Sequence, residues 1–431
     1  MLNRKAFVAI CFAVGLLISL PFVVSNRIAN ASEPIEILFS ITSDNIWDKE
    51  KIDNTLFFEK AIIKYEKLNP QIRIKLIKGL PRREYSEWLA QSILKGNQPD
   101  IFSVLPEDFC TLASIGALEA LDKHIEKLKP NKLEDVISKV LKTGQYKGIQ
   151  YAMPFEVIPT IMLVNESMLN GEGIDLPVKD WDWFDLVCIS NSVIKDIDGD
   201  GQQDQYGITG YNWQHAVYSL EKRLFDEDGG KVFLNDSDVV YMVKYATSLN
   251  QRNMNLTGMD FNSGKVAFRP YPFSAARRMM KNDEGIKNSA SFDWKIIKIP
   301  KGLDGKTSSE LHSMPVAISA RSQYKSEAWK FIDFISGDVE IQKDVLKYSY
   351  GLPILKSVLM SDETAELLSP YADAGLLHEV IKESIAPFTF RKYKQAMNMA
   401  DKEIFQFIKG DKDIDVELEK LNNEISKFLH E

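Results

Sequence analysis

The sequence predicts an α/β protein with two lobes. Strand-like and helix-like segments alternate from residue 35 onward, which implies a largely parallel sheet with helical crossovers. The 431 residues are 45% hydrophobic and 26% charged, which is the composition of an ordinary globular protein. No Pro-, Ser- or Gly-rich linker separates two halves, so lobes joined by several crossing connections fit better than independent domains.

The first five expected elements follow a βαβαβ order. Residues 35–41 are apolar almost throughout, as in a strand that is covered on both faces. Residues 56–68 place apolar side chains at helical spacing before an Asn-Pro stop, and residues 72–76 alternate as a strand does. A helix over residues 85–93 and a strand over residues 99–105 complete the unit.

In sheets of this kind, ligands bind beyond the carboxyl ends of the parallel strands. Three loops follow the predicted strands, at residues 42–48, 79–83 and 106–109. We therefore expect the functional site to draw on these loops.

Later parts of the chain show further periodic segments. Helices are expected from Trp181 onward, over residues 239–249, from a Ser326 cap onward and over residues 418–428, and short strands over residues 266–268 and 295–300.

Charge and motifs exclude several classes of function. The formal net charge of −8 offers no basic excess to hold a phosphate backbone, so nucleic acid is not an expected partner. The chain has no G-x-S-x-G, H-E-x-x-H or P-loop sequence, and none of its five His residues pairs at metal-ligand spacing. The sequence thus favours a binding protein over an enzyme.

Residues 1–31 have the three parts of a secretory signal. Two basic residues precede an almost wholly apolar run over residues 6–24, and an A-N-A cleavage site ends at Ala31, so that the mature chain would begin at Ser32. The alternative is an uncleaved anchor, because an apolar run of this length can cross a bilayer. We expect an exported protein that works in the extracellular space, at the cell surface or in the periplasm.

Two cysteines lie beyond the signal segment, Cys110 and Cys188. A disulfide between them is one interpretation in an oxidising compartment, and two small buried thiols are the other. Neither cysteine has a nearby His or a C-x-x-C partner, which argues against a metal or redox role.

Six short phrases stand in order along most of the chain after the signal segment. They are G-N-Q-P-D-I at residues 96–101, G-A-L-E-A-L-D at 116–122, Y-K-G and Y-A-M-P within 146–154 followed by L-V-N at 163–165, W-D-W-F-D at 181–185, D-I-D-G-D-G at 196–201 followed by Y-G at 206–207, and G-L-P at 351–353. Together they resemble the extracellular solute-binding proteins of ABC importers. The resemblance is to family 1, which includes the maltose-binding proteins and mostly binds sugars.

This resemblance implies a periplasmic-binding-protein type II fold, in which crossing hinge strands join two lobes that close on a ligand. We expect residues 32–155 and 296–344 in the first lobe, and residues 156–295 and 345–431 in the second. The expected hinge crossings lie at residues 155–160, 295–300 and 345–350.

A sugar has apolar C–H faces and many hydroxyls, so its site needs flat aromatic rings together with carboxylates or amides. The candidate ligand-binding residues are Asp44, Trp47, Glu107, Asp108, Glu156, Trp213, Tyr271 and Phe273. Trp181 and Trp183 are interpreted as structural, because large aromatic residues are mostly buried. Arg82 and Arg83 are interpreted as a solvated helix start rather than an anion clamp.

One acidic segment matches the first half of an EF-hand loop, with carboxylates at positions 1, 3 and 5 and a glycine at position 6. The candidate calcium ligands are Asp196, Asp198, Asp200, Gln202 and Asp204. Position 12 is Gly207, where a bidentate Glu belongs, so a polar turn with solvated acids is the alternative. No other cofactor is expected.

We therefore expect a non-catalytic, monomeric binding protein that captures a carbohydrate, in particular an oligosaccharide, and delivers it to the permease of an ABC importer. Contact with the membrane would come only through the importer or an uncleaved anchor. One alternative is a secreted polysaccharide hydrolase that uses Glu107 and Asp108 as its carboxylate pair. Another is a sensor or adhesin built on the same fold.

Overall fold

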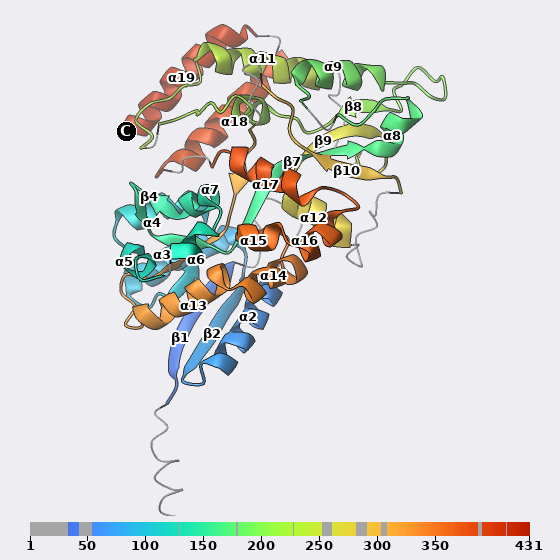
Figure 1. Cartoon of the computed structure of the whole chain (residues 1–431). Coiled ribbons are helices and arrows are strands. Elements are labelled where there is room, and N and C mark those ends of the chain that lie inside the picture. Colours follow the sequence, from blue (N-terminus) through green and yellow to red (C-terminus); the bar gives the residue numbers. More distant parts are fainter. Residues whose placement is uncertain are drawn as a thin grey trace, which may run out of the picture.

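The computed structural model describes residues 33–42, 54–128, 130–177, 180–226, 228–251, 261–281, 291–302, 308–386, 390–410 and 412–431. Two α/β lobes lie one above the other, and β7 (Glu156–Asn165) runs from the region between them into the second (Figure 1). The predicted two-lobed α/β fold is confirmed. None of the helices within these ranges has the length and apolar content that a bilayer crossing requires.

A five-stranded sheet forms the centre of the first lobe. Its strands are β1 (Ile35–Thr42), β2 (Ile72–Leu80), β3 (Ile101–Ser103), β6 (Ala152–Pro154) and β12 (Pro315–Ile318). Their order is β2-β1-β3-β12-β6, and β1 pairs in parallel with both β2 and β3, which confirms the βαβαβ unit. β12 returns from much later in the chain and lies antiparallel to β3 and β6.

Helices cover both faces of this sheet. They are α2 (Thr55–Leu68), α13 (Lys325–Gly337) and α14 (Val339–Tyr348) on one face, and α3 (Arg82–Lys95) and α4 (Pro106–Ser114) on the other. The ring of Phe331 in α13 packs edge-on against Phe39 of β1, with centroids 5.7 Å apart. Gly96 ends α3 at a φ of 73°, a left-handed conformation that favours glycine. Ser326 is not the cap of α13 as predicted, because the first helical carbonyl belongs to Tyr324, two residues earlier.

Short elements connect β3 with β6. They are α5 (Asp122–Ile125), α6 (Pro130–Glu134), α7 (Ser138–Leu141), the 3-10 helix η1 (Lys142–Gly144) and the hairpin of β4 (Gln145–Tyr146) and β5 (Ile149–Gln150). Gly144 lies so close to Ala152 that a Cβ would come within 1.9 Å of its carbonyl oxygen. Only glycine fits there, which fixes the approach of the hairpin to β6.

The second sheet has the order β10-β7-β9-β8, and β7 is buried along its whole length. The added strands are β8 (Tyr206–Ile208), β9 (Val266–Pro272) and β10 (Trp294–Ile297). β10 pairs with the far half of β7, so the start of the predicted crossing at residues 295–300 is a sheet strand of the second lobe. The chain returns to the first lobe later, through β11 (Leu311–His312), which pairs with β7 at Ile158 and Pro159.

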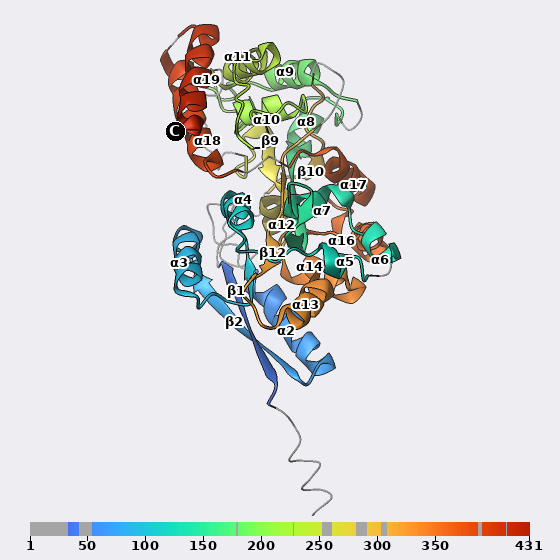
Figure 2. The same cartoon turned by 90° about the vertical axis from the view of Figure 1, so that its left-hand side faces the viewer.

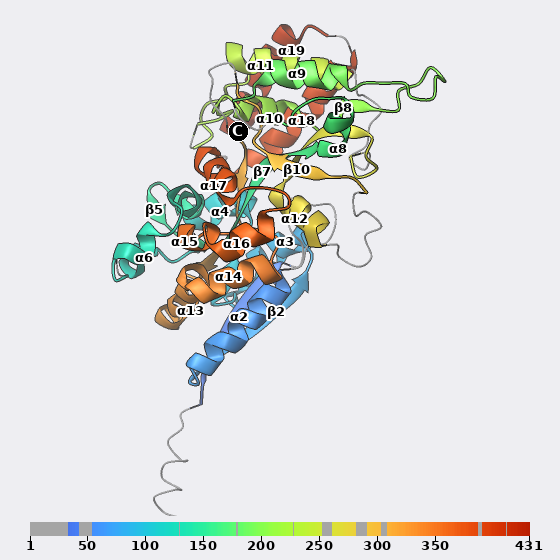
Figure 3. The same cartoon turned by 45° about the vertical axis from the view of Figure 1, so that its right-hand side comes forward.

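Two groups of helices accompany the second sheet. The outer group is α8 (Glu166–Gly171), α9 (Trp183–Ser192), α10 (Trp213–Tyr218), α11 (Ser237–Gln251), α18 (Tyr393–Gly410) and α19 (Ile414–His430). A middle group, α12 (Phe273–Lys281), α15 (Lys356–Leu359), α16 (Asp362–Leu368) and α17 (Ala374–Glu383), lies between the outer parts of the two lobes (Figure 3). Asp182 caps α9 by accepting hydrogen bonds from the backbone nitrogens of Phe184 and Asp185. Trp181 and Trp183 are buried in the core beside it, as predicted.

Three chain segments meet at the hinge: the start of β7, β11 and β13 (Leu352–Pro353). Glu156, the first residue of β7, is fully buried. Its carboxylate accepts hydrogen bonds from Asn54 Nδ2 at 2.7 Å, from the Gly351 backbone nitrogen at 3.0 Å and from Ser349 Oγ. A Cβ on Gly351 would lie 2.5 Å from this carboxylate, so the close approach requires glycine.

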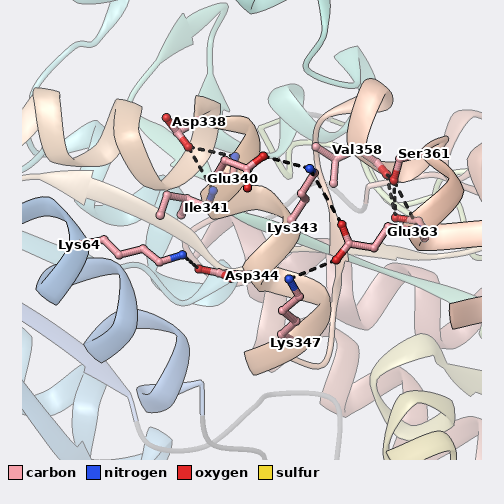
Figure 4. A network of polar contacts seen from close by, with 11 residues as sticks. Lys64, Asp338, Glu340, Ile341, Lys343, Asp344, Lys347, Val358, Ser361 and Glu363 are labelled. Carbon is pink, nitrogen blue, oxygen red and sulfur yellow. Dashed lines mark hydrogen bonds and ion pairs between the residues drawn. The ribbon is translucent and has the colours of Figure 1, made fainter.

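Helix α14 leads into the hinge and is tied to its neighbours by ion pairs (Figure 4). Lys64 of α2 pairs with Asp344 on one side. Lys343 and Lys347 reach Glu363 of α16, with nitrogen–oxygen distances of 4.0 and 3.1 Å. The helix therefore links the first lobe with the middle group of helices.

Candidate functional site

A cavity of about 590 Å³ lies between the lobes and is lined by both lobes and by the hinge. Sites for small molecules typically measure about 300–1,000 Å³. The start of α18 in the second lobe faces α4 in the first lobe across this region (Figure 2).

The first-lobe wall begins with an ion pair between Arg82 and Glu107. These residues follow β2 and β3, the two neighbours of β1. The loops at the carboxyl ends of these parallel strands therefore contribute residues to the cavity wall, where we expected a site. Arg82 Nε donates a hydrogen bond to Glu107 Oε1 at 3.1 Å, and Lys394 of the second lobe lies 3.3 Å from the same oxygen. Burial alone would raise the pKa of Glu107, but the Arg82 guanidinium outweighs it and holds the pKa below its usual value. The side chain of Arg82 is only 24% exposed, so it is a cavity residue and not the solvated helix start that we expected.

The rest of this wall comes from the short elements before β6 and from α4. It includes Phe109, Lys139, Lys142, Thr143 and Tyr146. Thr143 Oγ1 lies 2.6 Å from Ser313 Oγ, which joins this wall to the hinge. The wall therefore combines aromatic faces, a hydroxyl pair and two lysines.

The second-lobe wall is mainly one face of α18. Its lining residues are Tyr393, Lys394, Met397 and Asn398, together with Arg223. Residues four apart on a helix lie on the same face, so this spacing turns all four side chains of α18 toward the cavity side. The Tyr393 ring packs edge-on against Phe390 at 5.6 Å, and its hydroxyl lies 3.4 Å from that of Tyr218. These contacts fix the position of the ring.

The hinge contributes a buried acid–imidazole pair. His312 Nε2 lies 3.3 Å from Glu310 Oε2, and both residues line the cavity. Burial would raise the pKa of Glu310, but the neighbouring His312 outweighs it and the pKa is lowered. Burial lowers the pKa of the nearby His215 to about 4, so that imidazole is neutral at physiological pH.

Taken together, the lining can hold a polar, hydroxyl-rich molecule from both sides. Tyr146 and Tyr393 offer flat rings, and charged groups beside them offer hydrogen bonds. Tyr146 belongs to one of the six short sequence motifs that resemble the family. Tyr393 belongs to none of them, so the sequence analysis did not identify it. Its helix reaches the cavity only through tertiary packing.

Two other predicted acids do not line this cavity. Asp108 turns aside and accepts a hydrogen bond from Ser86 Oγ, and burial raises its pKa. Glu156 is enclosed in the hinge, where its oxygens are already held by three donors.

The predicted aromatic residues in the described part of the chain also lie elsewhere. Trp213 is 5% exposed and its Nε1 donates a hydrogen bond to Asp401 Oδ1 at 3.0 Å. Phe273 is fully buried, and Tyr271 stacks under the Arg269 guanidinium at 3.8 Å. An aromatic residue beside a strand suits core packing as well as ligand contact, and these rings contribute to packing within the second lobe. Asp44, Trp47, Ala31 and Ser32 lie outside the described residues.

The aspartate loop lies outside this cavity and is largely exposed. Oxygens of Asp196, Asp198 and Asp204 all lie within 4.8 Å of one another. Asp200 is not part of this group, and its carboxylate accepts a hydrogen bond from the backbone nitrogen of Gln202 at 2.7 Å.

The two cysteines are not joined to each other. Cys110 is half-buried and lines the cavity, whereas Cys188 is exposed on α9. The expectation of two buried thiols is therefore wrong, because Cys110 is only half-buried and Cys188 is exposed.

Comparisons with known proteins identify a matching family and solved structures of the same fold. A family model described as "Bacterial extracellular solute-binding protein" matches residues 49–340. The sugar-binding protein MalE of Xanthomonas citri shares the fold with a TM-score of 0.78 and 15% identity, over 92% of this chain and 98% of that one. The cyclic alpha-maltosyl-1,6-maltose binding protein of Arthrobacter globiformis gives 0.76 and 17%, over 92% and 99%. An ABC substrate-binding protein of Listeria monocytogenes in complex with cycloalternan gives 0.70 and 19%, over 92% and 100%.

Proposed function

Because the chain belongs to the bacterial extracellular solute-binding protein family, we propose that it captures a carbohydrate, in particular an oligosaccharide, and delivers it to the permease of an ABC importer. The observation that carries this proposal is the cavity between the lobes, with aromatic rings and charged groups on both walls. The sugar ligands named for proteins of the same fold support it.

The mechanism follows from the position of the cavity. A ligand that contacts α4 and α18 together makes its full set of contacts only when the lobes are close. Binding therefore stabilises the closed arrangement, by as much as the ligand prefers that state over the open one. The importer then distinguishes loaded from empty protein by shape.

A thermal-shift screen of neutral and charged oligosaccharides tests the proposal. A ligand in large excess over its Kd adds about 3–4 kcal/mol of stability, which raises the melting temperature by several degrees. Tyr146→Ala should weaken binding of that ligand about tenfold, because a ring face is lost. Tyr241→Ala, at a half-exposed tyrosine of α11, is the matched control. Failure of every carbohydrate to shift the melting temperature would contradict the proposal.

The binding role is proposed as non-catalytic. A glycosidase pair would need one carboxyl group to hold a proton, but Arg82 keeps Glu107 ionised and Asp108 does not face the cavity. Turnover of any glycoside that disappears in Glu107→Gln would favour the hydrolase instead. The second candidate function is that of a sensor or adhesin that binds its ligand in the same cavity. Copurification of the protein with a permease would distinguish transport from this alternative.

We also propose export through the segment ending at Ala31, and a monomeric mature form starting at Ser32. Amino-terminal sequencing of the exported protein tests the first point, and its mass in solution tests the second. An unprocessed amino terminus would favour the anchor.

Calcium binding by the aspartate loop is a separate proposal. Asp196, Asp198 and Asp204 already converge, but Gly207 supplies no bidentate carboxylate. The expected Kd is therefore weak, on the order of 10⁻⁴–10⁻³ M. Calorimetric titration of chelator-treated protein checks this value, and Asp196→Asn should abolish the heat. No heat in the wild-type protein would end the proposal.

A further inference from the structure

We propose that the cargo of the cavity is an anionic oligosaccharide, one that carries carboxylate or sulfate groups. This deepens the proposed function and rests on it. Cationic side chains outnumber carboxylates on the cavity wall. The cations are Arg82, Lys139, Lys142, Arg223 and Lys394, and the carboxylates are Glu107 and Glu310.

The two carboxylates are already held by neighbours. Glu107 lies between Arg82 and Lys394, and Glu310 lies against His312. The charge of Glu107 is therefore balanced by its two cationic neighbours, and Lys139 and Lys142 remain as the other cations of the first-lobe wall.

Lys139 and Lys142 form the strongest part of the excess. They stand three residues apart where α7 runs directly into η1, a spacing that brings two side chains to the same face. Across the ranges that the structure describes, neither ammonium group has an ion pair or a hydrogen bond, although both residues line the cavity. Like charges at this spacing destabilise the segment slightly, and an anionic ligand would remove that cost.

Positive charge also stands on the opposite wall. Arg223 and Lys394 belong to the second lobe, so closure brings them toward Lys139 and Lys142 of the first lobe. A bound anion is attracted to both walls, so ligand charge favours the closed state directly.

The cationic wall is a local feature of an acidic protein. The whole chain has a formal net charge of −8 and a pI near 5.4. A cleft lined by one sign of charge concentrates ligands of the other sign, whatever the net charge of the molecule.

The remaining lining favours a sugar chain over a small inorganic anion. Tyr146 and Tyr393 offer apolar faces for sugar rings, and about 590 Å³ is space for a ligand far larger than one phosphate or sulfate. The lysines would thus contact the charged groups of a glycan, while its sugar rings lie against the aromatic side chains.

Calorimetric titration with matched ligands tests the inference. Trigalacturonate is compared with its methyl ester, and a sulfated chondroitin oligosaccharide with its unsulfated form, so that the two sources of charge are separated. We expect at least one charged ligand to bind about tenfold or more tightly than its partner at low salt, with a smaller ratio at high salt.

The double variant Lys139→Gln and Lys142→Gln should lose about tenfold or more in affinity for the charged ligand, because two attractive contacts to the anion are removed. Its affinity for the less charged partner should change less than about twofold. Lys330→Gln, on the exposed side of α13, is the control. The two single variants, each checked by thermal unfolding, keep the test valid if the double variant folds poorly.

Equal or tighter binding of a neutral oligosaccharide, or an unchanged affinity of the double variant for the charged ligand, would overturn the inference and leave the proposed function standing. Binding of neither neutral nor charged carbohydrate would overturn both.

Discussion

Glu156 is a fully buried carboxylate at the point where three chain segments cross. Asn54, Ser349 and Gly351 each donate a hydrogen bond to it, and these residues come from α2, the end of α14 and the segment before β13. One side chain therefore holds two other chain segments to the start of β7. Removing it leaves Asn54 Nδ2 without this acceptor, and leaves Ser349 Oγ and the Gly351 nitrogen with contacts of 3.1 and 3.5 Å.

Glu156→Ala should lower the free energy of unfolding by about 1–3 kcal/mol, the cost of buried polar groups left unsatisfied. Urea denaturation measures the change. Glu366→Ala, at an exposed position of α16, is the control and should stay within about 0.5 kcal/mol of the wild type. Equal effects of the two variants would refute this role for Glu156.

The same residue predicts a pH dependence. Burial raises the pKa of Glu156 above its ordinary value of 4.5. A carboxyl group with a raised pKa in the folded state contributes stability that is fully present below its unfolded-state pKa and is lost as the pH rises through the folded-state pKa. The stability of the wild type relative to Glu156→Gln, which does not titrate, should therefore fall as the pH rises above the ordinary pKa of 4.5. A difference that stays constant as the pH rises would contradict the raised pKa.

At the scale of elements, α14 depends on its cap more than on its surface ion pairs. Asp338 Oδ1 accepts hydrogen bonds from the backbone nitrogens of Glu340 and Ile341 at 3.0 and 3.1 Å (Figure 4). The pairs of Lys343 and Lys347 with Glu363 are about half exposed on the acidic side and are screened by water.

Asp338→Ala should cost about 0.5–2 kcal/mol of stability, because two backbone donors at the helix start lose their acceptor. Glu363→Gln serves as the comparison and should cost no more than about 1 kcal/mol. Thermal unfolding of both variants in the same buffer checks the order. A larger loss for Glu363→Gln would mean that the ion pairs dominate.

The elements were predictable where the chain itself carries the pattern. The apolar spacing in residues 56–68 and the apolar runs of the strands before and after it are local properties, and the structure has a helix and parallel strands where expected. Loops at the ends of parallel strands pointed to Glu107, and the structure places this residue in the cavity wall. Trp213 was placed in the site from its chemistry alone, and nothing in its neighbourhood in sequence shows that it packs inside a lobe. Tyr393 belongs to a helix hundreds of residues away from Glu107, so only tertiary structure brings it to the cavity.

At the scale of the whole molecule, two ion pairs within the described ranges cross the gap through exposed lysines. Lys147 of the first lobe lies 3.5 Å from Asp228 of the second, and both side chains are more than half exposed. Lys394 reaches Glu107 across the cavity at 3.3 Å, with its own side chain 60% exposed. Exposed pairs contribute about 0–1 kcal/mol each, so they hold the lobes together only weakly. The ligand must supply most of the free energy of closure.

Small-angle X-ray scattering with and without a saturating oligosaccharide tests most directly that the two lobes close on a ligand. The ligand is one that raises the melting temperature of the protein in the thermal-shift screen. We expect the radius of gyration to fall when it binds, because contacts on both walls draw α4 and α18 together. Superimposable scattering profiles for the free and the saturated protein would contradict this account.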